Sequence, residues 1–144
     1  MSDCLNIITM IEINNLTVAS VDYDFLRKIA KIVLNKEKRK LDLSVALVGP
    51  VRIKELNKKY RKKNKTTDVL SFSYDTFGEI VICLREVRQN AKKFGFSFKE
   101  ELARVLIHGI LHLLGYEHEK SKKEAEKMEK KENYYLNLWL KLKS

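Results

Sequence analysis

The side chains of this chain best suited to chemistry are its histidines, which all lie within a short stretch. They are His108, His112 and His118. Residues four apart lie on one face of a helix, so the first two imidazoles can point at a common centre. Gly115 can end the helix in the left-handed conformation and turn the chain back, bringing the third imidazole to the same centre. This spacing predicts a metal site on a helix and the turn after it.

Zinc is the metal that this ligand set favours. Three neutral imidazoles leave one tetrahedral position for water, as in catalytic sites, whereas a structural site is usually closed by a fourth ligand. Neither Cys4 nor Cys83 lies near the histidines in the sequence, although folding could bring one of them close. We therefore expect one Zn²⁺ per chain. The alternative is three ordinary histidines of a helix and a loop.

The histidine spacing is also that of zinc proteases, whose motif is H-E-x-x-H-x-x-G-x-x-H. Where those enzymes carry the glutamate that acts as general base, this chain has Gly109, which has no proton acceptor in its side chain. The chain thus has the three histidines of the protease metal site but not the glutamate that acts as the general base.

Residues 108–118 resemble the H-G-x-L-H-L-x-G-Y-D-H signature of the bacterial YbeY family, single-strand-specific endoribonucleases of ribosomal RNA maturation. Residues 57–73 resemble the family run N-x-x-Y-R-x-K-x-x-P-T-D-V-L-S-F-P, and residues 78–82 resemble its G-D-I-x-I strand. The chain departs from these patterns at Thr66 and Ser73, where the family usually has proline, and at Glu79 and Glu117, where it has aspartate. The resemblance implies a metal-dependent hydrolase that acts in small-subunit rRNA 3′-end maturation and in ribosome quality control.

Two residues are predicted to be catalytic, Arg61 from the resemblance and Glu117 from its place beside the third histidine. Arg61 belongs to the family's Tyr-Arg pair, and its planar guanidinium can bind two phosphate oxygens at once. Glu117 is expected to transfer a proton or, as the preferred interpretation, to support a ligand imidazole. Asp68 could orient a ligand or only end a strand, and the role of Glu79 stays open. So does the nucleophile, either hydroxide or the RNA 2′-hydroxyl.

The stretch from Arg52 to Lys65 is strongly basic, with Glu55 as its only acid. The whole chain has 29 Lys and Arg against 19 Asp and Glu, a net charge of +10, which favours polyanionic partners. One interpretation of the run is a solvated helix face. Because it leads into the second family segment, we interpret it instead as a phosphate-contacting surface. The predicted RNA-binding residues are Lys58, Lys59, Lys62, Lys63 and Lys65.

Two other classes of function stay open beside the ribonuclease. A zinc metalloprotease-like hydrolase would share the histidine spacing. A non-catalytic, zinc-stabilised RNA- or ribosome-binding factor would share the basic surface. Metal-dependent cleavage of RNA, or of a protein substrate, by the purified chain distinguishes the three.

The length of 144 residues predicts a single domain, 1–144. No apolar run approaches the roughly 18 residues of a membrane span, and the first residues lack the features of a secretory signal. We therefore expect a cytoplasmic protein with free thiols, Cys83 packing in the core. The expected partners are single-stranded RNA, ribosomal RNA and the small ribosomal subunit, with no membrane and no secreted partner.

The elements that position these groups can be inferred from apolar spacing. Strands are predicted over residues 7–13, 41–48, 68–74 and 79–84. Helices are predicted from Asp22 to the charged stretch 36–40, over about 51–62 and 85–94, and from the capping box Ser97–Glu100 through the histidines. A last helix is expected to start solvated, over residues 119–131, and then to dock through Tyr134, Tyr135, Leu138 and Trp139.

The predicted inward-facing helix residues include Ile53, Leu56, Tyr60, Val87, Ala91, Phe94, Leu102, Val105, Leu106, Ile110 and Leu113. The order β-α-β-α-β-β-α-α-α predicts an α+β fold, with a small mixed four-stranded sheet and about five helices packed over it. The metal site would lie on a central helix, whose packed face holds the two histidines on a rigid element.

Overall fold

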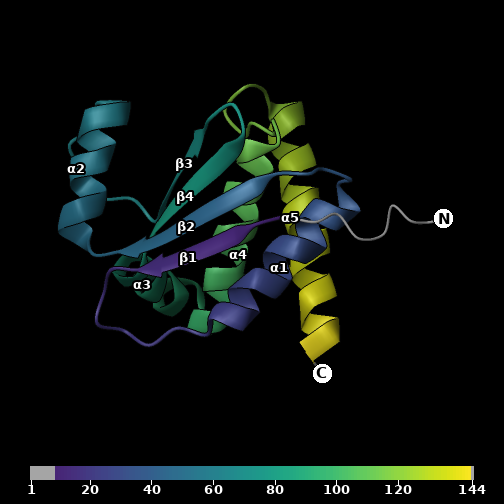
Figure 1. The fold of residues 1–144 in the computed structure, drawn as a ribbon, viewed down its shortest axis with the longest axis horizontal. Helices are drawn as coiled ribbons and strands as arrows, with labels where there is room; N and C mark the ends of the chain where they lie inside the picture. Colours follow the sequence, from purple (N-terminus) through teal and green to yellow (C-terminus); the bar gives the residue numbers. More distant parts are fainter. Residues whose placement is uncertain (1–8, 144) are drawn as a thin grey trace.

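The computed structural model describes residues 9–143, which form four strands and five helices in the predicted order (Figure 1). The strands are β1 (Ile11–Asn15), β2 (Asp42–Val48), β3 (Val69–Ser73) and β4 (Phe77–Cys83). The helices are α1 (Tyr23–Lys36), α2 (Pro50–Arg61), α3 (Leu84–Phe94), α4 (Phe98–Leu113) and α5 (Lys122–Lys143). Cys4 and the first two residues of the predicted strand 7–13 lie outside the described part. The α+β prediction is confirmed.

The sheet is mixed and has the strand order β1-β2-β4-β3. Strands β1 and β4 run parallel to β2, whereas β3 runs antiparallel to β4, with Ser71 opposite Ile80. Strand β3 is therefore an edge strand, and one row of its backbone N–H and C=O groups faces away from the sheet. This free edge becomes important below, because the candidate site is built beside it.

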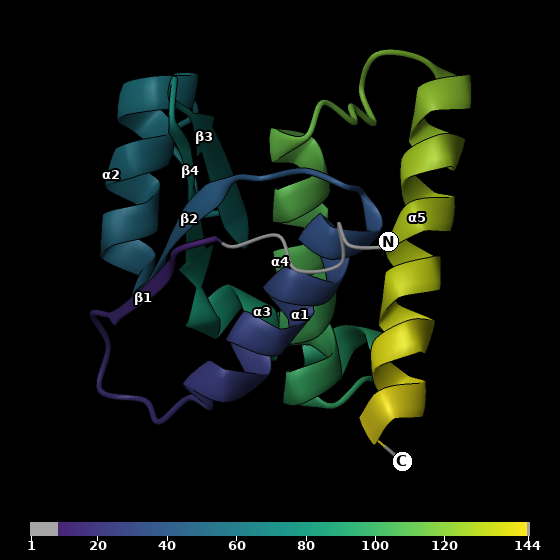
Figure 2. The same ribbon diagram turned by 45° about the vertical axis from the view of Figure 1, so that its right-hand side comes forward.

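Helices α1, α4 and α5 lie on one side of the sheet and α2 on the other, with α4 between the sheet and α5 (Figure 2). Helix α4 is almost enclosed, since Leu102, Leu106 and Ile110 are each at most 1% exposed. Burying each such side chain contributes about 1.5–3 kcal/mol to folding. The helix that carries His108 and His112 is thus held firmly by the core, as its apolar face predicted.

The ends of the helices follow local sequence signals. The side chain of Asp22 accepts a hydrogen bond from the Phe25 N–H and begins α1. At the start of α4 both halves of the predicted capping box form, between Ser97 and Glu100. Gly95 ends α3 with φ at 76°, a conformation that favours glycine. No helix of residues 9–143 has the length and apolar character needed to cross a bilayer.

Three aromatic residues predicted to face inward are exposed. Tyr60 is 52% exposed, because α2 buries Ile53 and Asn57 and turns Tyr60 to the rim of the sheet. Phe94 is 54% exposed, because it is the last residue of α3. In α5, Tyr135 is buried as predicted, whereas Tyr134 is 51% exposed on the adjoining face. For these three side chains the prediction was wrong.

Candidate metal centre

The three histidines converge on one region at the end of α4. His108 and His112 lie on this helix, and His118 lies in the loop that follows it. Gly115 has φ at 104°, the left-handed conformation predicted for it, and Tyr116 N–H then donates to the Leu111 carbonyl at 3.1 Å. The chain turns back at this point. The loop therefore brings its histidine toward the two histidines of the helix.

The ring separations come close to those of a metal site. Ring centroids are 5.2 Å apart for His108 and His118, 6.4 Å for His108 and His112, and 6.3 Å for His112 and His118. Metal–nitrogen distances of about 2.0–2.1 Å in tetrahedral geometry place ring centres about 5 Å apart. One pair matches, and the His112 ring lies about 1 Å too far out. Consistently, no group of three His, Cys, Asp or Glu among residues 9–143 is compact enough here to hold a metal ion.

The Nδ1 contacts of two rings leave their Nε2 atoms available to bind a metal. His108 Nδ1 lies 3.1 Å from Glu132 Oε1, and His112 Nδ1 lies 3.2 Å from the Tyr116 carbonyl oxygen. With the proton on Nδ1, each ring donates to its oxygen partner and keeps Nε2 as a lone-pair donor for a metal. Such contacts also fix the ring orientation. The donor set therefore fits a metal ion after a small inward shift of one ring.

The carboxylate that supports a histidine comes from α5, not from the residue expected. Glu117 is exposed and does not line the cavity beside the histidines, so the structure does not bring it to the site. Glu132, for which nothing was predicted, makes the contact that was predicted for Glu117, and the Glu132 side chain is only 12% exposed. Glu119, which lines the cavity, lies 3.7 Å from His118 Nε2. Glu132 is 24 residues from His108 in the sequence, so no local motif could have identified it.

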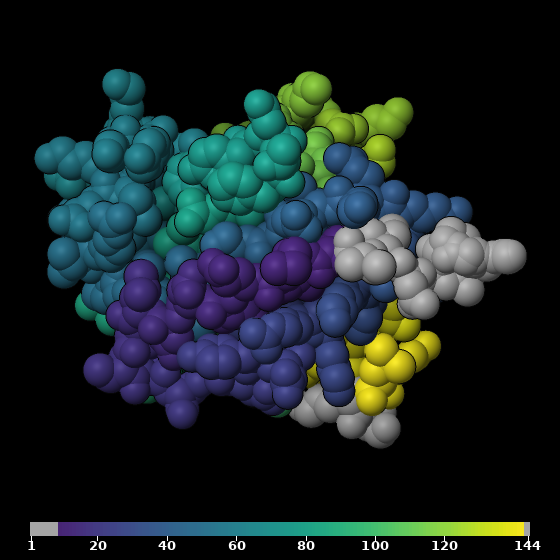
Figure 3. Space-filling view, in the orientation of Figure 1, coloured from purple at the N-terminus to yellow at the C-terminus, as the bar shows by residue number. Residues whose placement is uncertain are grey.

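A cavity of about 310 Å³ joins the histidines to the end of α2 and to β3. In Figure 3 the teal β3–β4 hairpin lies between α2 and the yellow-green segment that follows α4. The lining residues are Asn57, Arg61, Lys63, Lys65, Thr67, Asp68, Val69, Leu70, Ser71, His108, His112, His118 and Glu119. Three predicted metal ligands thus share a cavity with three predicted cationic residues. The combination suits a phosphate-bearing ligand.

Arg61 is held against the free edge of β3. Its Nη2 donates to the Ser71 carbonyl oxygen at 2.7 Å, and its guanidinium carbon lies 4.9 Å from the centre of the Phe72 ring. No carboxylate within residues 9–143 forms an ion pair with this arginine. Since only one N–H group is used by the strand, the rest of the planar fork remains for a ligand.

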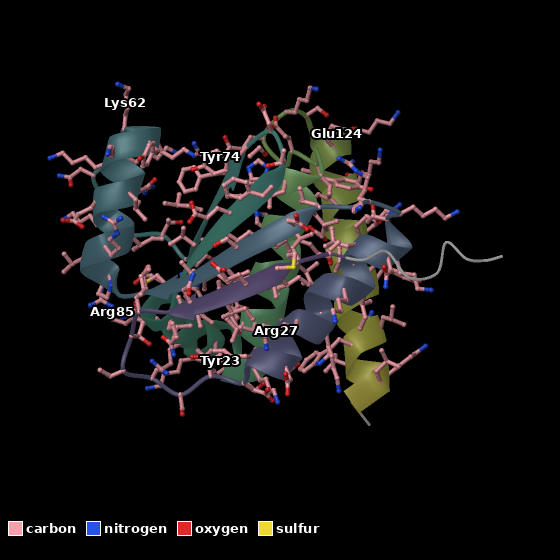
Figure 4. All side chains as sticks on the ribbon, viewed as in Figure 1. Tyr23, Arg27, Lys62, Tyr74, Arg85 and Glu124 are labelled. Carbon is pink, nitrogen blue, oxygen red and sulfur yellow. The ribbon has the colours of Figure 1, made fainter. Side chains whose placement is uncertain are left out.

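The five predicted RNA-binding lysines divide into two groups: two of them line the histidine cavity, and three do not. The side chain of the buried Asn57 donates from Nδ2 to the Lys65 carbonyl at 3.0 Å, and its backbone carbonyl accepts from the Lys63 N–H at 3.2 Å. These bonds hold Lys63 and Lys65 at the cavity, which both residues line. Lys58, Lys59 and Lys62 are exposed and do not line the cavity. Figure 4 shows Lys62 at the end of α2 pointing away from the sheet.

The two acids whose roles stayed open lie in different places. Asp68 lines both the histidine cavity and a neighbouring cavity of about 170 Å³ behind His108. That smaller cavity also holds Glu101, whose pKa is raised by burial although Arg104 opposes the shift. Glu79 lies in a groove on the opposite face of the sheet, so it takes no part in the site.

Gly109, the residue that replaces the protease glutamate, lies where α4 touches the sheet. A Cβ there would be 3.1 Å from Ile80 Cγ2 and 3.2 Å from Ser71 Oγ. The Ser71 hydroxyl donates to the Gly109 carbonyl at 3.1 Å, which ties the helix to β3. Even the Cβ of a glutamate would require one of these side chains to move by a few tenths of an ångström. Glycine therefore suits the close packing here, a reason that the motif comparison did not supply.

A buried carboxylate holds the loop behind the site. Glu37, at the end of α1, accepts hydrogen bonds from Tyr135, from Tyr116 at 2.7 Å and from Lys131 at 3.0 Å. Burial acts to raise the pKa of Glu37, but these three donors outweigh it and hold the pKa below its ordinary value of 4.5. Tyr116 also contacts His112 through its carbonyl. The network thus connects α1 and α5 to the metal-binding loop.

We expect Glu37→Gln to lower the free energy of unfolding by about 2 kcal/mol at pH 7, because an amide cannot accept from all three donors. A lowered carboxylate pKa stabilises the fold above pH 4.5, and this contribution is lost as the pH falls through the folded-state pKa. The difference between the two proteins should therefore shrink on acidification. Urea unfolding at neutral and acidic pH measures both effects, with the exposed Glu129→Gln as control. An equal difference at every pH would contradict the assignment.

Comparison with known proteins gives a consistent result. The family model described as "Endoribonuclease YbeY" matches residues 11–139. A protein of that name from Thermodesulfovibrio yellowstonii is 47% identical over 119 residues, which are 77% of this chain and 74% of the relative. Another from Petrotoga mobilis is 38% identical over 135 residues, 90% of this chain and 94% of the relative. The matched region includes all three histidines and the basic run.

The fold is also similar to a solved structure. The solution structure of TM1509 from Thermotoga maritima has a TM-score of 0.70 with this chain and 37% sequence identity. The similarity covers 90% of this chain and 89% of that one. It therefore extends over the sheet and the helices on both of its sides.

Proposed function

Because the chain belongs to the YbeY family of endoribonucleases, we propose that it hydrolyses single-stranded RNA at the histidine cavity with the help of one zinc ion. The observation that carries the proposal is the composition of this cavity. Three imidazoles converge there, and cationic side chains from α2 and the loop after it line the same space. A bound metal can polarise a phosphoryl oxygen and activate water, and cationic side chains bind phosphate oxygens, so this combination suits phosphodiester cleavage.

His108, His112 and His118 would hold the metal, which when bound polarises a phosphoryl oxygen and activates water. Glu132 and the Tyr116 carbonyl orient two of these rings through Nδ1. Arg61 presents its free N–H groups to the phosphate where negative charge develops. Lys63 and Lys65 contact neighbouring phosphates and position the strand, and they carry no sequence information.

The biological substrate that we infer is ribosomal RNA, in small-subunit 3′-end maturation and ribosome quality control in the cytoplasm. The net charge of +10 supports binding to such a polyanion. We further propose that residues 1–144 are one endoribonuclease domain. One buried cluster supports this, since it joins the sheet with α1, α4 and α5.

Purified protein is expected to retain about one zinc per chain and to cleave a short single-stranded RNA. A chelator should stop cleavage, zinc should restore it, and an RNA duplex should be cut far more slowly. Metal analysis and a gel assay measure these results, with casein as a control substrate. The proposal fails if the metal-loaded protein leaves RNA intact, or if it digests casein in a chelator-sensitive reaction.

A further inference from the structure

A second pocket lies between the end of α1 and α5. Its volume is about 450 Å³, and it is lined by Lys36, Lys127, Lys130, Lys131, Tyr134 and Tyr135. It shares no lining residue with the histidine cavity. Figure 2 shows α2 and α5 on opposite sides of the molecule. The pocket is therefore a separate surface, and its lining residues within 9–143 are all lysines and tyrosines.

The positive charge of this pocket is largely uncompensated. Lys127, Lys130 and Lys131 share one face of α5, because they are three and four residues apart. Lys131 pairs with Glu37, but Lys36 and Lys130 form no ion pair with any carboxylate of residues 9–143. The charge extends beyond Lys36, since the exposed stretch 38–40 is Lys-Arg-Lys. The only acid in residues 36–40 is Glu37, whose carboxylate accepts hydrogen bonds from Tyr116 and Tyr135.

An aromatic ring stands among these lysines. Tyr134 is 51% exposed, and its ring packs edge-on against that of the buried Tyr135 at 5.1 Å. The inner tyrosine thus supports the outer one and leaves much of Tyr134 open to solvent. Exposed aromatic rings beside lysines are the recurring arrangement of single-strand nucleic-acid sites, where bases stack and phosphates are neutralised. A membrane surface would instead need an apolar stripe, and this face of α5 carries lysines around its tyrosine.

We propose that the α1–α5 pocket is a second RNA-binding site, which holds a single-stranded segment of the substrate outside the segment that is cleaved. Lys36, Lys127 and Lys130 contact phosphates, and a base stacks on Tyr134. This inference rests on the proposed function in one respect, namely that the substrate is RNA. The Lys127 ammonium lies 5.6 Å from the Tyr116 ring, so the pocket adjoins the loop that ends in His118. In this proposal, a strand leaving the cavity continues over this loop to the pocket.

The test compares a short RNA of about six nucleotides with a long one of about twenty, since single-strand sites occupy about 4–16 nucleotides. The variant is Lys130→Ala with Tyr134→Ala, both exposed and remote from the histidines. Its matched control is Lys122→Ala with Asn133→Ala, which removes the same charge from another face of α5. Fluorescence anisotropy gives Kd and its salt dependence, and cleavage kinetics give kcat and KM for both RNAs.

For the pocket variant we expect the Kd and KM of the long RNA to rise about tenfold, since a lost stacking contact costs about 1–3 kcal/mol. The salt slope should fall by about 0.7 for each lost phosphate contact. Cleavage of the short RNA should be unchanged, and the control variant should behave like the parent protein. The proposal is overturned if both RNAs weaken equally, if the control variant weakens as much, or if neither RNA is affected. It is also overturned if the pocket variant loses binding only to anionic phosphatidylserine vesicles.

These outcomes separate the pocket from the proposed function. Parent protein that cleaves no RNA but binds the long strand through Lys130 and Tyr134 would remove the nuclease assignment and support the pocket. If the parent protein and the variant without these two side chains cleave both RNAs equally well, the nuclease assignment stands and the proposed RNA site in the pocket is wrong.

Discussion

Replacing His112 with alanine is expected to weaken metal binding by more than about 100-fold and to abolish most RNA cleavage. Loss of a contact outside the metal ligands usually costs 10- to 100-fold in affinity or activity, and loss of a ligand should exceed it. His112 is informative because its ring stands farthest from the other two, at 6.3 and 6.4 Å between centroids. To bind a metal together with the other two histidines, the His112 ring would have to move closer to their rings.

Metal titration of the purified variant measures the affinity, and Glu132→Gln provides a graded comparison. An amide at position 132 can still accept from His108 Nδ1 but carries no charge, so we expect a loss within the 10- to 100-fold range. Glu129→Gln, exposed on the same helix, should leave the metal affinity unchanged. Thermal unfolding of each apo-protein checks that the fold persists. Unchanged metal content in the His108, His112 and His118 alanine variants would remove the site assignment.

Much of the architecture could be predicted because the local signals agree with the tertiary packing. In α4, the capping box at Ser97 fixes where the helix starts, and apolar residues at helical spacing place one face in the core. Gly115 then ends the helical segment in the conformation expected of it. Given a helix start, a buried face and a turn, the approximate convergence of the three histidines follows from geometry alone.

The rest depended on contacts between residues distant in the sequence. Glu132 reaches His108 only because α5 packs along α4, and no local pattern near the histidines records that packing. Tyr60 and Tyr134 are assigned to apolar stripes by their spacing, but each lies on a face of its helix beside the buried one and is about half exposed. Gly109 differs from the protease motif for a packing reason that becomes visible only when Ile80 is placed against it. Tertiary neighbours decide such positions, and periodicity does not identify them.

Replacing Arg61 with alanine is expected to lower kcat by about 100- to 1,000-fold while changing the KM for a short RNA only slightly. Interactions that are stronger in the transition state than in the ground state raise kcat, and a guanidinium beside the cleaved phosphate meets the largest charge there. The Ser71 carbonyl and the Phe72 ring already orient Arg61, so little order has to be gained during the reaction. Arg61→Lys should restore little activity, because an ammonium cannot reproduce the planar fork.

The matched control for Arg61 is Lys62→Ala, which removes the same charge from the next residue. Lys62 points away from the sheet at the end of α2 and does not line the cavity (Figure 4). Its loss should weaken RNA binding slightly, flatten the salt dependence and leave kcat unchanged. Steady-state kinetics at two salt concentrations measure both variants, and metal content should be normal in each. If Arg61→Ala and Lys62→Ala both change affinity alone, Arg61 is a backbone contact that positions the strand and has no part in stabilising the transition state.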